Sequence, residues 1–137
     1  MKTLLLATLM TFSQFTLAHA PVFKTANYQD YQTVETRLTQ VAIAKIRPER
    51  IQDFKRVVNR LLTRLQAQEG NLGYTYSQNQ EDPSEFIFHE NWLNGRSIKK
   101  HMESELIQEF FGEVGSYFEP GFPQLIILED QGEKNEN

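Results

Sequence analysis

The sequence predicts an α+β domain in which a four-stranded antiparallel sheet carries its helices on one face. Three observations predict this class. Segments with the two-residue period of strands alternate with segments that have the period of an amphipathic helix. Their order along the chain is strand, helix, strand, strand, helix, strand. The 137 residues are enough for one domain and too few for two.

The first strand and the first helix meet near Pro48. Residues 38–46 are rich in β-branched and small apolar side chains, which is typical of a strand. Pro48 suits the first position of a helix, where its missing N–H leaves no partner unsatisfied. After Pro48, apolar residues recur on one helical face, at Ile51, Phe54, Val58, Leu61, Leu62 and Leu65. Gly70 is a suitable residue to end this helix.

The middle of the chain predicts a hairpin. Residues 72–77 alternate apolar and small polar side chains, residues 85–92 form the next strand, and Asp82-Pro83 marks the turn between them. Asn94 is a reasonable cap for the second helical stretch, residues 98–118, which has a break near Glu103-Ser104. Prolines and Gly121 end this stretch.

The closing strand is residues 124–128, and it completes the β-α-β-β-α-β order of a ferredoxin-like, split βαβ sheet. Its helices cover one face only. The other face carries alternate residues such as Tyr74, Phe88 and Trp92, or their neighbours, depending on the register. Such a face is too apolar to remain in water, so we expect a second copy of the chain to cover it, giving a homodimeric α/β barrel.

Both ends of the chain differ from this domain. Residues 1–20 combine a basic start at Lys2, a short apolar run and Ala18-His19-Ala20, which predicts a cleaved signal peptide and a periplasmic or secreted protein without stable membrane insertion. An uncleaved N-terminal anchor is the alternative. Residues 21–36 are interpreted as an N-terminal arm. Residues 130–137 lack apolar side chains and predict a disordered tail.

Composition narrows the classes of function. The chain has no cysteine, so disulfides and zinc–thiolate sites are excluded. A net charge of −4 argues against nucleic acid as a partner. Neither an HExxH motif nor a GxGxxG loop is present, and the sequence predicts no metal and no cofactor.

Residues 37–129 resemble the antibiotic biosynthesis monooxygenase family, and within it the small quinol-monooxygenase-type members. The resemblance is carried by LTQVAIAKIRPERIQDF, EGNLGYTYSQN, FIFHENWLNGRSIKKHMESELIQEFF and PQLIIL. Its most specific part is Glu90-x-Trp92, followed nine residues later by His101, then Ser104 and Phe110-Phe111. The resemblance implies a dimeric α/β barrel with a pocket between sheet and helices, and oxidation of phenols or hydroquinones by O₂ without flavin, haem or metal.

Haem-degrading relatives share this fold and differ at two positions. They place an asparagine on the first strand, where this chain has Gln40, Val41 and Ala42. They place a haem-ligating histidine late in the second helix, where this chain has Phe111. Both departures argue against haem degradation.

His101 is the candidate catalytic residue. It shares an apolar helical face with Ile98 and Met102, and an imidazole there could take a phenolic proton near neutral pH. The alternative is a core histidine bonded to the backbone. Glu90 is expected to pair with an arginine such as Arg96.

The candidate substrate-binding residues are Trp92, Tyr74, Phe88 and Asn91. Trp92 and Phe88 would shape the pocket, and a buried Tyr74 hydroxyl needs a partner that a ligand could supply. Core packing is the alternative for Trp92, and the dimer interface for Tyr74. Asn91 is on the opposite side of its strand from Trp92, as a polar pocket group or an exposed one.

The leading hypothesis is therefore a cofactor-independent monooxygenase that acts on a small quinol or phenolic aromatic with O₂. A non-catalytic, small-molecule-binding dimeric barrel is the first alternative. An isomerase of small carbonyl compounds is the second, and it is disfavoured because only one plausible base is visible and such reactions usually need a second acid–base group.

Overall fold

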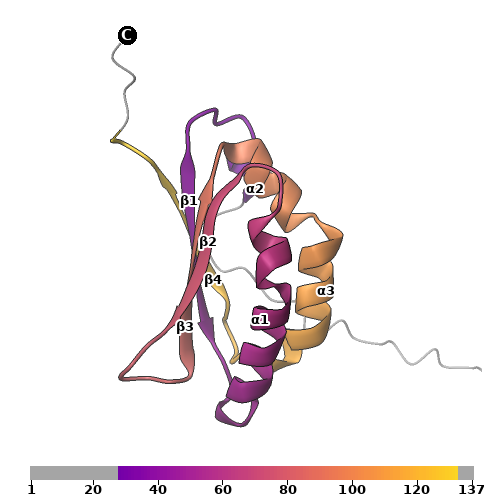
Figure 1. Ribbon diagram of the computed structural model, residues 1–137. Coiled ribbons are helices and arrows are strands. Elements are labelled where there is room, and N and C mark those ends of the chain that lie inside the picture. The colour runs from indigo at the N-terminus through magenta and orange to yellow at the C-terminus, as the bar shows by residue number, and fades with distance from the viewer. Residues whose placement is uncertain (1–27, 133–137) are drawn as a thin grey trace, which may run out of the picture.

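The computed structural model describes residues 28–132. Four strands form one antiparallel sheet in the order β2-β3-β1-β4. The three α-helices lie together on one face of the sheet (Figure 1). The predicted signal peptide falls outside the described residues, as do residues 21–27 of the predicted arm and residues 133–137 of the predicted tail. Elements follow one another as β1 (Leu38–Lys45), α1 (Ile51–Gln66), β2 (Asn71–Gln78), β3 (Glu85–Trp92), α2 (Gly95–Met102), α3 (Glu105–Val114) and β4 (Gln124–Glu129).

The predicted α+β, ferredoxin-like class is confirmed, with small differences at the ends of elements. Pro48 opens a short 3-10 turn, Pro48–Arg50, and α1 follows it. Ile46 lies just beyond β1 and makes a bridge to Phe118. The predicted break in the second helix separates α2 from α3 because the Ser104 side chain accepts a hydrogen bond from Ile107 N–H and so caps a new helix.

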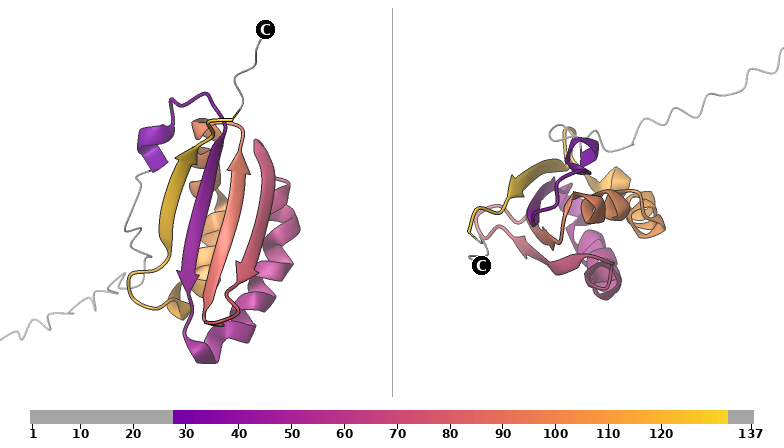
Figure 2. Two further views of the ribbon diagram at one scale, coloured as in Figure 1. Left: turned by 90° about the vertical axis from the view of Figure 1, so that its left-hand side faces the viewer. Right: turned by 90° about the horizontal axis from the view of Figure 1, so that it is seen from above.

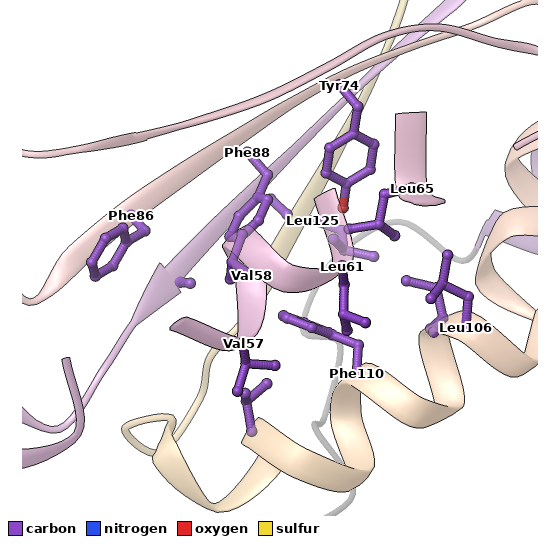
Figure 3. Close-up of a cluster of buried hydrophobic side chains, with 14 of the residues drawn as sticks. Val57, Val58, Leu61, Leu65, Tyr74, Phe86, Phe88, Leu106, Phe110 and Leu125 are labelled. Carbon is purple, nitrogen blue, oxygen red and sulfur yellow. The ribbon is translucent and has the colours of Figure 1, made fainter. Parts of the chain in front are cut away.

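The core lies between the sheet and the helices. Side chains from β2 and β3 point toward those of α1 and α3 (Figure 3). Phe54 of α1 is fully buried, and its ring lies 5.1 Å from the Phe86 ring and 6.2 Å from the Phe110 ring. On the outside, Arg64 of α1 forms an ion pair with Glu109 of α3, which ties these two helices together.

The register decides which strand residues face the helices. Tyr74, Phe88 and Trp92 all belong to the helix side, where they are buried. Their neighbours in the sequence occupy the other face, which none of the helices within residues 28–132 covers (Figure 2). On β4 that uncovered face includes Ile126 and Leu128, which are 41% and 50% exposed.

The described part of the arm is docked on the domain. Tyr28–Tyr31 forms a 3-10 turn beside α2. The Gly95 N–H donates to the Val34 carbonyl at 2.8 Å, and a Cβ at Gly95 would lie 1.6 Å from the Tyr31 carbonyl oxygen. Glycine is therefore the residue that lets the arm approach the start of α2 so closely.

Candidate active site

A small cavity of about 30 Å³ lies between the sheet and helices α2 and α3. Phe88 and Leu125 of the sheet and Phe110 and Phe111 of α3 form much of its apolar wall. A volume of this size admits one or two water molecules. The polar side chains that line it are Gln40, Tyr74, Glu90 and His101.

The Glu90 carboxylate is the centre of the polar network. Glu90 and Trp92 are two residues apart on β3, so both point toward the helices. Glu90 Oε2 lies 3.1 Å from Trp92 Nε1, 3.1 Å from Gln40 Nε2 and 3.3 Å from His101 Nε2. The indole and amide N–H groups can only donate, so this oxygen accepts from both of them. A favourable contact with His101 Nε2 then needs one proton between Oε2 and the ring nitrogen.

The second nitrogen of His101 is fixed by another chain of hydrogen bonds. The Ser104 hydroxyl donates its single hydrogen to the His101 carbonyl at 2.7 Å, so Ser104 Oγ accepts from Gln68 Nε2 at 3.1 Å. That orients the Gln68 amide with Oε1 toward His101 Nδ1, at 2.6 Å. Because Oε1 is an acceptor, Nδ1 also carries a hydrogen.

The hydrogen-bond pattern thus places one shared proton between His101 and Glu90, in addition to the hydrogen on Nδ1. The side chains of His101 and Glu90 are only 1% and 3% exposed. A buried charge needs such a partner, because burial penalises an isolated ion heavily. The pair is neutral as a whole and contains one proton more than a carboxylate beside a neutral imidazole.

Aromatic groups enclose the pair. The Trp92 ring lies 4.6 Å from the His101 ring, and the Tyr74 ring lies 5.8 Å from it. Burial raises the pKa of Tyr74 well above its usual range, and the charge of Glu90 and a hydrogen bond to it act in the same direction. The Tyr74 hydroxyl therefore remains a donor to Glu90 in the physiological range.

The predicted site residues fall into three groups. Tyr74, Phe88 and His101 line the cavity. Trp92 lies behind it, fully buried, and holds Glu90 through its indole N–H. Asn91 is not brought to the cavity, because successive strand residues face opposite ways, and it meets Thr39 on the uncovered face of the sheet.

The predicted pairing of Glu90 with Arg96 is wrong. Arg96 is exposed and pairs with Glu35 of the arm at 3.0 Å. Glu90 is 2% exposed and belongs to the cavity. The alternation on β3 could have revealed this, because Glu90 shares a face with the buried Trp92. No sequence signal singles out Gln40 or Gln68.

Two other features, a metal site and a membrane-spanning helix, can be checked within the described residues. Within residues 28–132, no group of three or more His, Cys, Asp or Glu side chains could hold a metal ion. In the same part of the chain, no helix has the length and apolar character required to cross a membrane.

The fold and the buried pair of Glu90 and His101 beside an aromatic-lined cavity define a small ferredoxin-like domain with a candidate site between its sheet and its helices. The sequence profile of the antibiotic biosynthesis monooxygenase family matches residues 37–113. The chain belongs to the antibiotic biosynthesis monooxygenase family.

Solved structures are similar in fold. A conserved protein from Methanosarcina mazei Go1 is 22% identical, with a TM-score of 0.66, and the match covers 71% of this chain and 95% of that one. A protein named antibiotic biosynthesis monooxygenase is 19% identical, with a TM-score of 0.64 and coverage of 69% and 98%. A protein from Pseudomonas aeruginosa is 21% identical, with a TM-score of 0.64 and coverage of 71% and 96%. No curated protein matches the chain.

Proposed function

We propose that this protein is a cofactor-independent monooxygenase that oxidises a small phenolic or quinol aromatic with O₂. The observation that carries the proposal is the buried Glu90–His101 pair at the edge of an aromatic-lined cavity. Family membership supports the class of reaction, and several structural neighbours have monooxygenase in their names.

The reaction balances without an added reductant. A phenol and O₂ give a quinone and water: the ring gains one oxygen atom and loses two hydrogens, and the second oxygen atom leaves as water. The substrate supplies all four electrons. Loss of the phenolic proton makes the ring electron-rich enough to pass the first electron to O₂, so the protein's tasks are to bind, deprotonate and enclose the substrate.

We assign proton acceptance to the pair rather than to His101 alone. Both ring nitrogens of His101 are directed at protein acceptors, whereas the Glu90 carboxylate borders the cavity. The substrate proton would pass to Glu90 and be stored on His101. The contacts described above correspond to the state that has accepted the proton, and the active base is the same pair with one proton fewer.

A ring-sized substrate requires the cavity to open. About 30 Å³ is too small for a phenol. Met102 and Phe111 are the lining residues of α2 and α3 that are only partly buried, and an unbranched methionine changes rotamer readily. We propose that these two side chains form the entrance and move aside when substrate binds.

An isomerase of small carbonyl compounds is the second candidate function. Glu90 and Tyr74 both lie beside His101 and supply the second acid–base group that such a reaction needs. Oxygen consumption separates the two reactions, since an isomerase uses no O₂. A binding protein without activity would neither consume O₂ nor isomerise the carbonyl compound.

The test is oxygen uptake with a panel of hydroquinones, followed by mass analysis of the product made under ¹⁸O₂. His101→Ala should lower turnover by about 10²–10⁴-fold, the usual contribution of a positioned proton acceptor. Unchanged turnover per folded molecule in His101→Ala would end its role in catalysis.

We also propose that the protein is an exported homodimer. The uncovered face of the sheet supports the dimer, and residues 1–20 support export. The intact mass of protein from a periplasmic extract should correspond to a start at His19 or Pro21. Retention of residues 1–20 in a membrane fraction would favour the anchor instead.

A further inference from the structure

Gln40 contains the one buried side-chain polar atom that has no hydrogen-bond partner in the described part of the chain. The atom is its amide oxygen, Oε1. Gln40 is 1% exposed and comes from β1, the strand between β3 and β4. Native proteins satisfy nearly all buried polar atoms, so an exception in a cavity wall calls for an explanation.

The orientation of this amide is set by its neighbour. Gln40 Nε2 lies 3.1 Å from Glu90 Oε2, an oxygen that already accepts the Trp92 indole N–H. An acceptor on Glu90 demands a donor on Gln40, so the NH₂ group faces Glu90. The amide nitrogen is also 3.6 Å from Met102 Sδ, which places this end of the side chain beside the proposed entrance.

The remaining oxygen is an unpaired acceptor on a side chain that lines the cavity together with Glu90, Tyr74 and His101. Those three side chains already satisfy one another. Tyr74 and His101 direct their hydrogens at Glu90 or Gln68, so none is available to Gln40 Oε1. The cavity therefore offers an incoming molecule an unused acceptor beside a carboxylate.

We propose that Gln40 determines specificity at this site by accepting a hydrogen bond from a free hydroxyl group on the aromatic ligand. The inference rests on the proposed function for the class of ligand. It adds that the cavity selects an aryl hydroxyl over the corresponding ether. An ether has no hydrogen to give, so its binding would leave Oε1 unpartnered and without water.

The same contact has a consequence for the chemistry. The two ends of the Gln40 amide would make different contacts. Nε2 contacts Glu90, and Oε1 of the same planar group would hold the ligand hydroxyl. The amide therefore places the hydroxyl oxygen close to the carboxylate that would receive its proton. Gln40 is a positioning residue in this scheme, since an amide oxygen does not itself take the proton.

The test uses phenol and anisole, which share a ring and differ in the hydroxyl hydrogen. Neither probe requires turnover, so the result is separate from the fate of the proposed oxygenation. Binding is measured by calorimetry or ligand-observed NMR. The wild-type protein should bind phenol about 10- to 100-fold more tightly than anisole, the usual effect of leaving a buried acceptor unsatisfied.

Two variants separate the oxygen of Gln40 from its nitrogen. Gln40→Met has a similar shape and removes both, whereas Gln40→Lys keeps a nitrogen donor for Glu90 and removes the acceptor. Both should reduce the preference for phenol to less than about threefold. Gln124→Met, the same change on the uncovered side of the sheet next to Leu125, should leave it unaltered.

Several outcomes would overturn the inference. These are equal binding of phenol and anisole by the wild-type protein, no binding of phenol at millimolar concentration, or a preference that persists in Gln40→Lys. A preference lost in Gln40→Met but kept in Gln40→Lys would assign the effect to the contact with Glu90 instead. Thermal unfolding of each variant checks its fold, and the wild-type comparison of the two probes decides the matter even if a variant fails to fold.

Discussion

Replacing Glu90 by glutamine tests the buried pair directly. The substitution keeps the shape of the side chain and removes its charge. Oε2 of Glu90 receives hydrogen bonds from Gln40 and Trp92 and the charged contact of His101, all within 3.3 Å. One member of a buried pair is then left without its counterion, which typically costs 3–5 kcal/mol. We therefore expect a loss of about 3 kcal/mol, at the lower end of that range.

That loss is large for a domain of this size. At roughly 4–8 °C per kcal/mol, it lowers the melting temperature by about 12–24 °C. Circular dichroism during thermal or urea unfolding measures it. Glu109→Gln is the matched control: Glu109 makes an exposed pair with Arg64, and such pairs contribute little. Its melting temperature should fall by a few degrees at most.

A double-mutant cycle completes the test. Glu90→Gln and His101→Asn should show a coupling free energy of about 1–3 kcal/mol, because each change removes the same contact. Two results would refute the assignment. One is a melting temperature for Glu90→Gln close to that of Glu109→Gln. The other is additivity of the two changes within about 0.5 kcal/mol.

Three further predictions concern the pH dependence, the entrance and the dimer. Because burial raises the pKa of Tyr74, the unfolded chain releases the Tyr74 proton above about pH 10 while the folded chain keeps it, so the free energy of unfolding falls with rising pH by up to about 1.4 kcal/mol per pH unit. Tyr74→Phe should remove this pH dependence, which urea unfolding at several alkaline pH values measures. Met102→Ala should widen the entrance and lower the KM for a bicyclic hydroquinone, by about tenfold at most, with little effect on a single-ring one; equal changes for both would argue against an entrance at Met102. If the protein is the proposed homodimer, replacing Ile126 and Leu128 together by aspartate should give a monomer in sedimentation experiments, because charges on that face oppose its burial. A dimer that persists in this variant would place the interface elsewhere.

The fold was predictable because its signals are local. The alternation in residues 72–77, the apolar face from Ile51 to Leu65 and the cap at Ser104 each depend on neighbouring residues. Such patterns survive without knowledge of the tertiary structure. They predict the order of elements and, through the split βαβ arrangement, the side on which the helices lie.

The candidate site was only partly predictable, because its contacts join distant parts of the chain. His101 was visible from its place on an apolar helical face. The role of Gln40 depends on β1 lying next to β3, and Gln68 lies in the turn after α1, so neither is marked by spacing. Asn91 shows the reverse case: the alternation placed it on the opposite face of its strand from Trp92, as a polar pocket group or an exposed one, and because the cavity lies on the Trp92 side, Asn91 faces away from it.

The docked arm changes where this domain begins. Similarity to the family starts at residue 37, which would be a natural place to truncate the chain. Tyr31 and Val34 nevertheless pack against the core, and the Val34 carbonyl accepts the Gly95 N–H at the first turn of α2. Since α2 contains His101, a fragment trimmed at the family boundary would lose a brace on the helix that positions it. Recombinant versions of this protein should therefore retain the segment from Tyr28 onward.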